Sequence, residues 1–548
     1  MKILLIVSAF NSLTQSVFCY LQDMEHTVSV QFAINDAEMI EAVESFKPDI
    51  IFCPYLKKFI PKEIFLNLPT FILHPGIRGD RGHNALDHAM LDEKKEWGVV
   101  IIRANEEFDG GDIYSEVRFE MREATKASIY RDEVATATLK AIQELFVNLE
   151  DKNFKPIPQI ETPMHRYLTQ EDIKIDWEKD TTKEIIKKIR LSDSFPGVKD
   201  VLLGIECYLF GVWEEERLKG QAKEILAKRD GAVCIGTVDG AIWISHLQEL
   251  GRFKLPATYV LKDKIKGVKE DRLPLIFDFS HKTFYEIGNT KDGDVSYLCF
   301  NFHNGAMSSE QCMRLKYAFE YLKERAKVIV LIGAAEFFSN GIHLNILEDS
   351  KKQGEDGWSN INAMNDLIKS IIFSDEIITV ASLHKNAGAG GVFLALACDY
   401  VVASKNTVLN PHYKTLGLSG SEYHTYTLPK RVGKSKSEEL VRSCLPISAS
   451  RAKDINMIDL VLEKENYFEC LRSYTQELVE DEDKYDEYIY EKQDYLQSSK
   501  DFINGCKEEE LKVMHPEFWS KESEFHKLRN EFVYKVCPIK TPQRLIDA

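Results

Sequence analysis

The sequence has no closely spaced cysteines, no long apolar run and no excess of basic residues. Its eleven cysteines are scattered, and the two nearest to one another, Cys299 and Cys312, do not form a CxxC motif. This spacing argues against a metal site and for reduced thiols, so we expect a cytoplasmic protein. The apolar start, MKILLIVSAF, is too short to span a bilayer and runs into the polar NSLTQS, which favours a first β-strand over a signal peptide.

Acidic residues outnumber basic ones in the chain. Its 548 residues include 70 Lys plus Arg and 87 Asp plus Glu, which gives a formal net charge of −17 at pH 7. Such a charge repels phosphate backbones, so nucleic acid is not expected as a partner. No membrane partner is expected either. The densest acidic run, ELVEDEDKYDEY at 477–488, is better explained as a solvated helix or loop than as a docking face.

The chain is too long for a single core, and its pattern changes along its length. In the first 150 residues, short β-branched runs alternate with helical segments such as DAEMIEAVESF, which predicts a mostly parallel sheet covered on both faces. The stretch FKPIPQIETPMHRYL at 154–168 predicts a linker, because three prolines in ten residues forbid a regular helix. The strands that follow are punctuated by Gly and Asp, as is typical of a small β-barrel.

The charged stretch LKDKIKGVKEDRLP separates these strands from a second region in which strands and helices alternate. Beyond about residue 460 the pattern is mainly helical. We therefore predict a multidomain α/β protein whose parts are a Rossmann-like domain at 1–165, a small β-barrel-like domain at 166–262, a linker at 263–283, and an α/β domain with a helical C-terminal region at 284–548.

A histidine ends a predicted strand in FILHPGIRGDRGHNALDHAM. The loop and helix that follow put the His74 imidazole at the carboxyl edge of a parallel sheet, where ligands bind. The segment FDGGD places Asp109 on a loop after the predicted strand at 99–103. A histidine beside a carboxylate is an acid/base pair, although purely structural roles explain two loop residues equally well.

Residues 1 to about 262 resemble methionyl-tRNA formyltransferase, including the segments YLTQEDIKIDWEKDTTKEIIKKIR and SFPGV. Members of that family use an Asn, a His and an Asp around the formyl group of 10-formyltetrahydrofolate. The resemblance therefore implies a formyltransferase domain that takes this cofactor, with His74 and Asp109 as catalytic residues. It also implies cofactor-binding positions at Ile72 and Gly110.

The expected Asn is replaced by Ile72, and the loop after His74 is one residue shorter than in the formyltransferases. A lost oxyanion donor costs about 10²- to 10³-fold in acyl transfer, so either another donor substitutes or the acceptor is easier to formylate. A thiol is such an acceptor, because thiolate is a strong nucleophile at neutral pH. Arg131, in SIYRDEV, is a further cofactor-binding candidate for a phosphate group, with a salt bridge within its helix as the alternative.

The segments GAAEFFSNGIHL and NAGAGGVFLALACD are similar to the two oxyanion loops of the enoyl-CoA hydratase/isomerase, or crotonase, family. This resemblance covers about 290–465 and implies that the N–H groups of Ile342 and Gly390 hold a thioester carbonyl. The first hydratase glutamate falls on Phe393, and the second falls on His412 or Tyr413. Hydration of an alkene is therefore not expected.

Two polar residues remain as catalytic candidates in this part of the chain. They are Tyr413, in NPHYK, and Glu422, in SGSEYHTY. Each also has a structural explanation, Tyr413 as a buried ring with one hydrogen bond and Glu422 as a surface or helix-capping carboxylate. The sequence leaves both explanations open.

A formyltransferase half followed by a crotonase half resembles the HypX-type hydrogenase maturation factors, whose signatures HPGIRGDRG and GSEY are similar. The resemblance implies that formyl passes from 10-formyltetrahydrofolate to coenzyme A, and that formyl-CoA then releases carbon monoxide for the iron of [NiFe]-hydrogenase. Its partners would be these small molecules and other hydrogenase maturation proteins. Phe393 would exclude water, which favours CO over formate.

Two alternatives to this function stay open. One is a formyltransferase for an amine acceptor that is fused to a separate acyl-CoA enzyme. The other is a non-catalytic scaffold that binds CoA or folate. The loss of polar groups at Ile72 and Phe393 would support this alternative.

Overall fold

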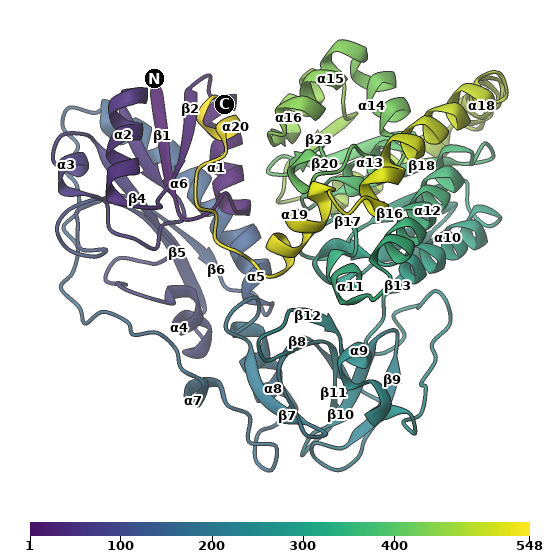
Figure 1. The fold of residues 1–548 in the computed structure, drawn as a ribbon, viewed down its shortest axis with the longest axis horizontal. Coiled ribbons are helices and arrows are strands. Elements are labelled where there is room, and N and C mark those ends of the chain that lie inside the picture. Colours follow the sequence, from purple (N-terminus) through teal and green to yellow (C-terminus); the bar gives the residue numbers. More distant parts are fainter.

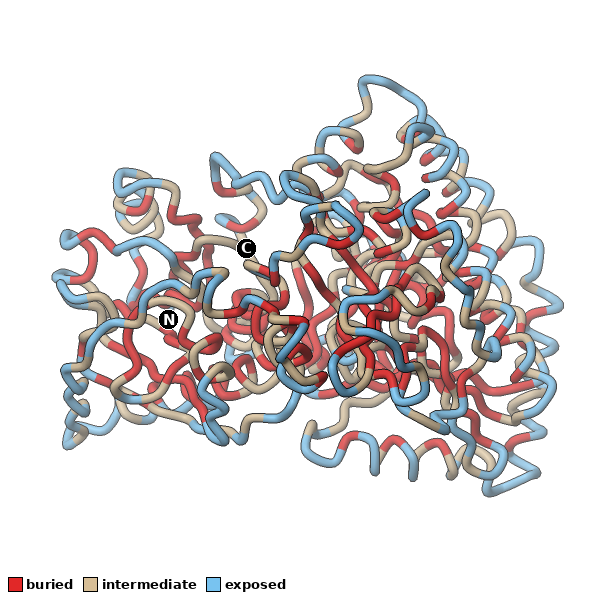
Figure 2. The backbone as a smooth tube through the Cα atoms, turned by 90° about the horizontal axis from the view of Figure 1, so that it is seen from below, coloured by how far each residue is buried: buried red, intermediate tan, exposed pale blue.

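Three six-stranded sheets organise the chain, and the computed structural model describes all of residues 1–548 (Figure 1). Two smaller sheets, of two and three strands, lie within the last part of the chain. Buried stretches run through the interior, while exposed turns form the periphery (Figure 2). None of the helices combines the length and the apolar character needed to cross a lipid bilayer.

The first sheet has the strand order β2-β1-β3-β4-β5-β6. Its strands are β1 (Lys2–Val7), β2 (Thr27–Phe32), β3 (Ile50–Cys53), β4 (Thr70–His74), β5 (Glu96–Arg103) and β6 (Ile113–Glu120). The first four strands in this order are parallel, as predicted, whereas β5 pairs antiparallel with both of its neighbours, β4 and β6. Antiparallel neighbours can be joined by a short loop, and the loop between β5 and β6 carries Asp109.

Helices cover both faces of this sheet. They are α1 (Ser12–Asp23), α2 (Asp36–Phe46), α3 (Lys62–Phe65), α4 (Ala85–Leu91), α5 (Lys126–Ile129), the π-helix η1 (Tyr130–Val134) and α6 (Ala135–Glu150). On one face Leu5 is buried with Phe18 of α1, and on the other Leu4 is buried with Met39 of α2. Successive side chains of a strand point to opposite faces, so β1 contributes to both cores.

The second sheet is antiparallel and has the order β7-β8-β11-β10-β9, with β12 paired to β11. Its strands are β7 (Val198–Leu202), β8 (Ile205–Glu215), β9 (Ile225–Arg229), β10 (Ala232–Gly236), β11 (Ala241–Glu249) and β12 (Lys254–Pro256). The accompanying helices are α7 (Gln170–Ile173), α8 (Thr182–Leu191), α9 (Ala257–Leu261) and η2 (Lys262–Ile265). Ile185 of α8 and Leu261 of α9 are buried in the core of this sheet.

The third sheet has the order β13-β14-β16-β18-β20-β23, and all neighbours except β13 and β14 are parallel. Its strands are β13 (Ile287–Asp292), β14 (Val295–Phe300), β16 (Val328–Ile332), β18 (Ile378–Leu383), β20 (Tyr400–Ser404) and β23 (Leu460–Leu462). The small sheets consist of β15 (Ala306–Met307) with β17 (Gly341–Ile342), and of β19 (Ala387–Gly388), β21 (Val408–Asn410) and β22 (Ile447–Ser448). These short pairings hold the loops that follow the main strands.

Helices dominate the last part of the chain. They are η3 (His303–Gly305), α10 (Ser309–Lys323), α11 (Leu344–Asp349), α12 (Gln353–Ile372), α13 (Gly390–Leu396), η4 (Lys414–Leu416), α14 (His424–Val432), α15 (Lys434–Ser443), α16 (Ala449–Asp454), α17 (Tyr467–Glu480), α18 (Glu482–Trp519), α19 (Glu524–Val533) and α20 (Gln543–Ile546). Phe319 of α10 and Ile361 of α12 are buried on one face of the sheet, and Leu471 of α17 is buried on the other. The acidic run predicted as a solvated helix or loop spans the end of α17 and the start of α18.

The C-terminal segment returns to the first domain. Leu545 of α20 is fully buried in the same core as α1, and the N–H of Phe32 in β2 donates to Thr541 Oγ1 at 2.9 Å. Figure 1 shows this yellow segment beside α1 and β2. Because the end of the chain completes the core of its beginning, the two halves are tied together at a point far from the covalent linker.

Candidate active sites

The imidazole of His74 lies between two carboxylates. Its Nε2 is 2.6 Å from Asp80 Oδ2, and its Nδ1 is 3.6 Å from Asp109 Oδ2. All three side chains are buried, with exposed fractions of 6%, 2% and 7% for His74, Asp80 and Asp109. The predicted pair is thus brought together, and Asp80 is a third member that the sequence did not reveal.

A glycine makes the approach of Asp80 possible. A Cβ at Gly76 would lie 2.4 Å from Asp80 Oδ2 and 2.5 Å from His74 Nε2, so a side chain there would occupy the space between them. Asp109 has a positive φ of 50° and accepts a hydrogen bond from the N–H of Gly82 at 3.1 Å. The second oxygen of Asp80 lies 3.2 Å from His165 Nε2, in the proline-bearing linker.

These carboxylates decide the charge of His74. Burial by itself would lower the pKa of His74, but the charges of Asp109 and Asp80 and the hydrogen bond to Asp80 outweigh it, so the pKa is raised from its ordinary value. The two carboxylates therefore favour protonation of the His74 imidazole more than water does.

Ile72 lies two residues before His74 on β4, and its side chain lines a small cavity of about 50 Å³. Asp109 also lines it, and the other lining residues are Leu56, Lys58, Phe59, Ile60, Phe65, Ala104, Asn105, Glu107 and Phe108. Gly110 is not part of this lining. A Cβ at Gly110 would lie 2.6 Å from Glu107 Oε2, so its small size serves the turn in which Asp109 is held.

The two predicted oxyanion loops of the crotonase half meet at Gly341 and Gly390. A Cβ at Gly341, whose φ is 79°, would lie 3.2 Å from the backbone nitrogen of Gly390. Gly390 is the first residue of α13, so its N–H has no partner within the helix. Ile342 follows directly in β17, which pairs with β15. The structure therefore brings the loop carrying the Ile342 N–H next to that of Gly390.

Glu422 and Tyr413 form a buried pair beside this point. The hydroxyl of Tyr413 lies 2.7 Å from Glu422 Oε2 and 3.0 Å from the carbonyl oxygen of Ser421. The other carboxylate oxygen of Glu422 lies 2.8 Å from the position of a Cβ on Gly390, so the carboxylate lies against the start of α13. With an exposed fraction of 1%, Glu422 is not a surface carboxylate.

Burial sets the titration of this pair. It raises the pKa of Glu422 to about 7, an effect that the hydrogen bond from Tyr413 only partly offsets. Burial and the neighbouring Glu422 together hold the pKa of Tyr413 well above its ordinary value. Near neutral pH the site therefore contains a carboxyl group that can take or release a proton, next to a phenol that stays protonated.

Phe393 closes the site on the side where a hydratase has its first glutamate. Its side chain is fully buried, and its ring stacks on that of Tyr413 with centroids 5.3 Å apart and planes inclined by 15°. Of the two residues at the second glutamate position, Tyr413 contacts Glu422, whereas burial lowers the pKa of His412 to about 4. The position that the resemblance assigns to the first hydratase glutamate is thus occupied by a buried aromatic ring that stacks on Tyr413.

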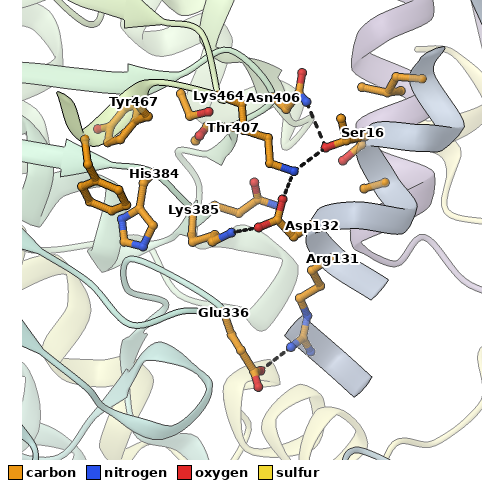
Figure 3. A pocket seen from close by; sticks show the side chains of 16 residues that line it. Ser16, Arg131, Asp132, Glu336, His384, Lys385, Asn406, Thr407, Lys464 and Tyr467 are labelled. Carbon is orange, nitrogen blue, oxygen red and sulfur yellow. Dashed lines mark hydrogen bonds and ion pairs between the residues drawn. The ribbon is translucent and has the colours of Figure 1, made fainter. Parts of the chain in front are cut away.

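Arg131 lies at a cavity of about 140 Å³ between the two halves (Figure 3). It forms an ion pair with Glu336 of the crotonase half, so the alternative of a salt bridge within its own helix is wrong. Asp132 forms ion pairs with both Lys385 and Lys464, as Figure 3 shows. These three cations face two carboxylates, which leaves the cavity wall with one excess positive charge.

Comparison with known families agrees with the three parts of the fold. The formyl transferase family matches residues 21–145, the formyl transferase C-terminal domain matches 167–264, and the enoyl-CoA hydratase/isomerase family matches 295–500. The hydrogenase maturation factor HoxX of Bradyrhizobium diazoefficiens is 35% identical, and the alignment covers 99% of this chain and 96% of that protein. The chain belongs to the HypX/HoxX family of hydrogenase maturation factors.

A solved structure of the same family is also similar to this chain over its whole length. HypX from Aquifex aeolicus, in complex with tetrahydrofolic acid, is 42% identical and superposes with a TM-score of 0.97 over 100% of this chain and 98% of that one. The methionyl-tRNA formyltransferase of Bacillus velezensis is 27% identical and covers 41% of this chain and 74% of its own length. The fold class predicted from the sequence, with its formyltransferase, antiparallel β and crotonase parts, is confirmed.

Proposed function

We propose that the chain makes carbon monoxide in two steps, by moving a formyl group from 10-formyltetrahydrofolate to coenzyme A and then splitting formyl-CoA into CO and CoA. The CO would become a ligand of the iron in [NiFe]-hydrogenase. The observation that carries the proposal is the buried Tyr413–Glu422 pair at the start of α13, where an acid and a base meet beside a thioester site that lacks the hydratase carboxylate.

The first step is assigned to the site around His74. The protonated imidazole offers a positively charged donor to the formyl oxygen, and this donor compensates for the amide that is missing at Ile72. The formyl oxygen would displace Asp80 from His74 Nε2 when the substrate binds. The thiol sulfur forms the new bond to the formyl carbon, the bond from that carbon to the folate nitrogen breaks, and the thiol proton passes to the departing nitrogen with Asp109 as the relay.

The second step is assigned to the site around Glu422. The N–H groups of Ile342 and Gly390 hold the thioester carbonyl, and the ionised Glu422 takes the formyl proton. The carbon–sulfur bond breaks with its electron pair on sulfur, which leaves CO. Tyr413 gives its proton to sulfur and regains one from Glu422, so the step consumes no proton overall.

Coenzyme A would have to reach both sites. The excess positive charge of the cavity that Arg131 lines supports a phosphate of CoA there, between the two halves. One bound pantetheine arm would then serve both reactions, which removes a diffusive step.

The first step is tested by the choice of acceptor. Purified protein is given 10-formyltetrahydrofolate with CoA, with an amine such as methionine amide, or with neither, and the quenched products are identified by mass spectrometry. Formyl-CoA as the main product supports the proposal. Formylated amine as the main product would favour an amine formyltransferase, and no turnover with any acceptor would favour a scaffold.

A further inference from the structure

The loop that carries Glu422 is held by the long helix α18. Residue Ser419 donates its N–H to both carboxylate oxygens of Glu517, at 3.1 and 3.0 Å. Seven residues earlier on the same helix, Glu510 lies under the next part of the loop. Residues seven apart share one face of a helix, so two carboxylates of α18 clamp the loop 417–425.

Glu510 is bound almost entirely by this loop. Its Oε2 accepts a hydrogen bond from the N–H of Tyr423 at 2.9 Å, and its Oε1 accepts from the N–H and the hydroxyl of Thr425 at 2.8 and 2.6 Å. The ring nitrogen Nδ1 of His424 lies 3.3 Å from Oε1. The residue is 4% exposed and pairs with no Lys or Arg. A buried carboxylate is costly to maintain, and here its compensation comes from the turn next to Glu422.

The backbone that Glu510 holds is strained. Glu422 and Tyr423 have φ values of 63° and 56°, in the left-handed region that side chains other than glycine rarely adopt. Such a conformation persists only when the surroundings enforce it. Asn365 of α12 also holds this turn, since it accepts the N–H of Glu422 at 3.2 Å and donates to Ser421 Oγ at 3.1 Å. The carboxylate of Glu422 is thereby directed at Tyr413 and Gly390.

We propose that Glu510 is a positioning residue for Glu422, which fixes the turn that presents this carboxylate and whose negative charge favours proton uptake by it. The assignment rests on the proposed role of Glu422 in CO release. Besides Glu510, the titratable groups that face Glu422 are Tyr413 from the loop after β21, His424 at the start of α14 and Cys312 on α10. Burial is the main cause of the raised pKa of Glu422, the hydrogen bond from Tyr413 opposes it, and the charge of Glu510 adds to it.

The test is the pH dependence of CO release from synthetic formyl-CoA by full-length Glu510→Gln, with Glu517→Gln as the matched control. Both variants remove a carboxylate that clamps the same loop from the same helix face, but only Glu510 is among the charges that act on Glu422. We expect kcat of Glu510→Gln to fall about 10- to 100-fold with KM nearly unchanged, as for a misplaced catalytic group. The midpoint of its rise with pH should move to lower pH, because the pKa of Glu422 falls. Glu517→Gln should keep the wild-type midpoint.

A readout that does not depend on turnover separates this assignment from the proposed function. The infrared band of the protonated Glu422 carboxyl, identified by its loss in Glu422→Gln, is titrated in wild type and in both variants. If wild type releases no CO, the proposed function fails, and this titration still decides the coupling between Glu510 and Glu422. An unchanged midpoint in Glu510→Gln, or an equal shift in Glu517→Gln, would overturn the assignment.

Should Glu510→Gln fail to fold, Glu510→Asp takes its place. It keeps the charge but withdraws it from the turn by one methylene. A lower kcat for formyl-CoA at an unchanged KM supports the assignment, and a kcat equal to that of wild type overturns it.

Discussion

The two candidate active sites raise the pKa of their central group by opposite means. At His74, burial opposes the charged form, and two carboxylates overcome it, so the pKa is raised by partner charges. At Glu422, burial itself is the main cause, and the nearest partner, Tyr413, works against it. The first site thus favours protonation of its imidazole, and the second keeps a carboxyl group that titrates near neutral pH. Surrounding charge and burial can therefore prepare an acid and a base within one chain.

The largest effect is expected from a substitution of His74. Replacing it with Ala removes the imidazolium and should lower formyl transfer to CoA by about 10³- to 10⁴-fold, the upper range for loss of an acid/base group. Release of CO from synthetic formyl-CoA should be unchanged, because that step uses the other site. Both rates are measured on the same folded sample. Loss of both activities would contradict the separation into two sites.

Glu422→Gln tests the second site in the same way as His74→Ala tests the first. It should lower CO release from formyl-CoA by about 10²- to 10³-fold and leave formyl transfer intact, since an amide cannot take the formyl proton. In wild type the same rate should rise with pH through a midpoint near 7 and level off at higher pH, because Glu422 must be ionised to act as a base. A pH-independent rate between pH 5 and 9 would show that another group accepts the proton.

Phe393→Glu tests whether Phe393 excludes water from the thioester site. The new carboxylate would lie in the first turn of α13, where the helix N-terminus favours a negative charge. It can bind and deprotonate water, so products of labelled formyl-CoA should shift from CO towards formate. Loss of the buried ring costs about 3 kcal/mol, and thermal unfolding must therefore be checked first. An unchanged CO-to-formate ratio in a folded variant would make Phe393 ordinary core packing.

Ile72→Asn has the smallest expected effect. It restores the amide of the formyltransferases near the formyl group, but the imidazolium already supplies a donor, so transfer to CoA should change by less than about threefold, well below the cost of a missing oxyanion donor. Transfer to amines or to water should increase. A large drop in CoA formylation by a folded variant would instead place Ile72 in the acceptor's path.

The sequence predicted what depends on local pattern. Alternating strands and helices, the linker prolines, and the placement of His74 at a strand end and of Asp109 on a loop after a strand follow from periodicity and turn residues. Asp80 stands in the quoted loop HPGIRGDRG, but its contact with His74 depends on a backbone that folds back at Gly76. Strand β6 was not predicted, although its polar residues Glu116, Arg118 and Glu120 alternate with the apolar Val117 and Phe119.

Contacts between segments that are distant in the chain could not be predicted from the sequence. Glu510 stands among many charged residues of α18, and nothing in its neighbours marks it as the one buried under the turn at Tyr423. The return of Leu545 to the first core, and the pairing of Arg131 with Glu336, likewise depend on how whole domains pack. Resemblance to known families located Ile342 and Gly390, which composition and periodicity could not.

The proposed function requires that both sites act in sequence on one formyl group. Purified protein is supplied with 10-formyltetrahydrofolate labelled with ¹³C in the formyl group, with and without CoA, and the headspace gas is analysed by mass spectrometry. We expect the release of labelled CO to depend on CoA and to be lost in both His74→Ala and Glu422→Gln. Labelled formyl-CoA should accumulate only in Glu422→Gln. Labelled CO without CoA, or labelled formyl-CoA that never yields CO in wild type, would contradict the proposed function.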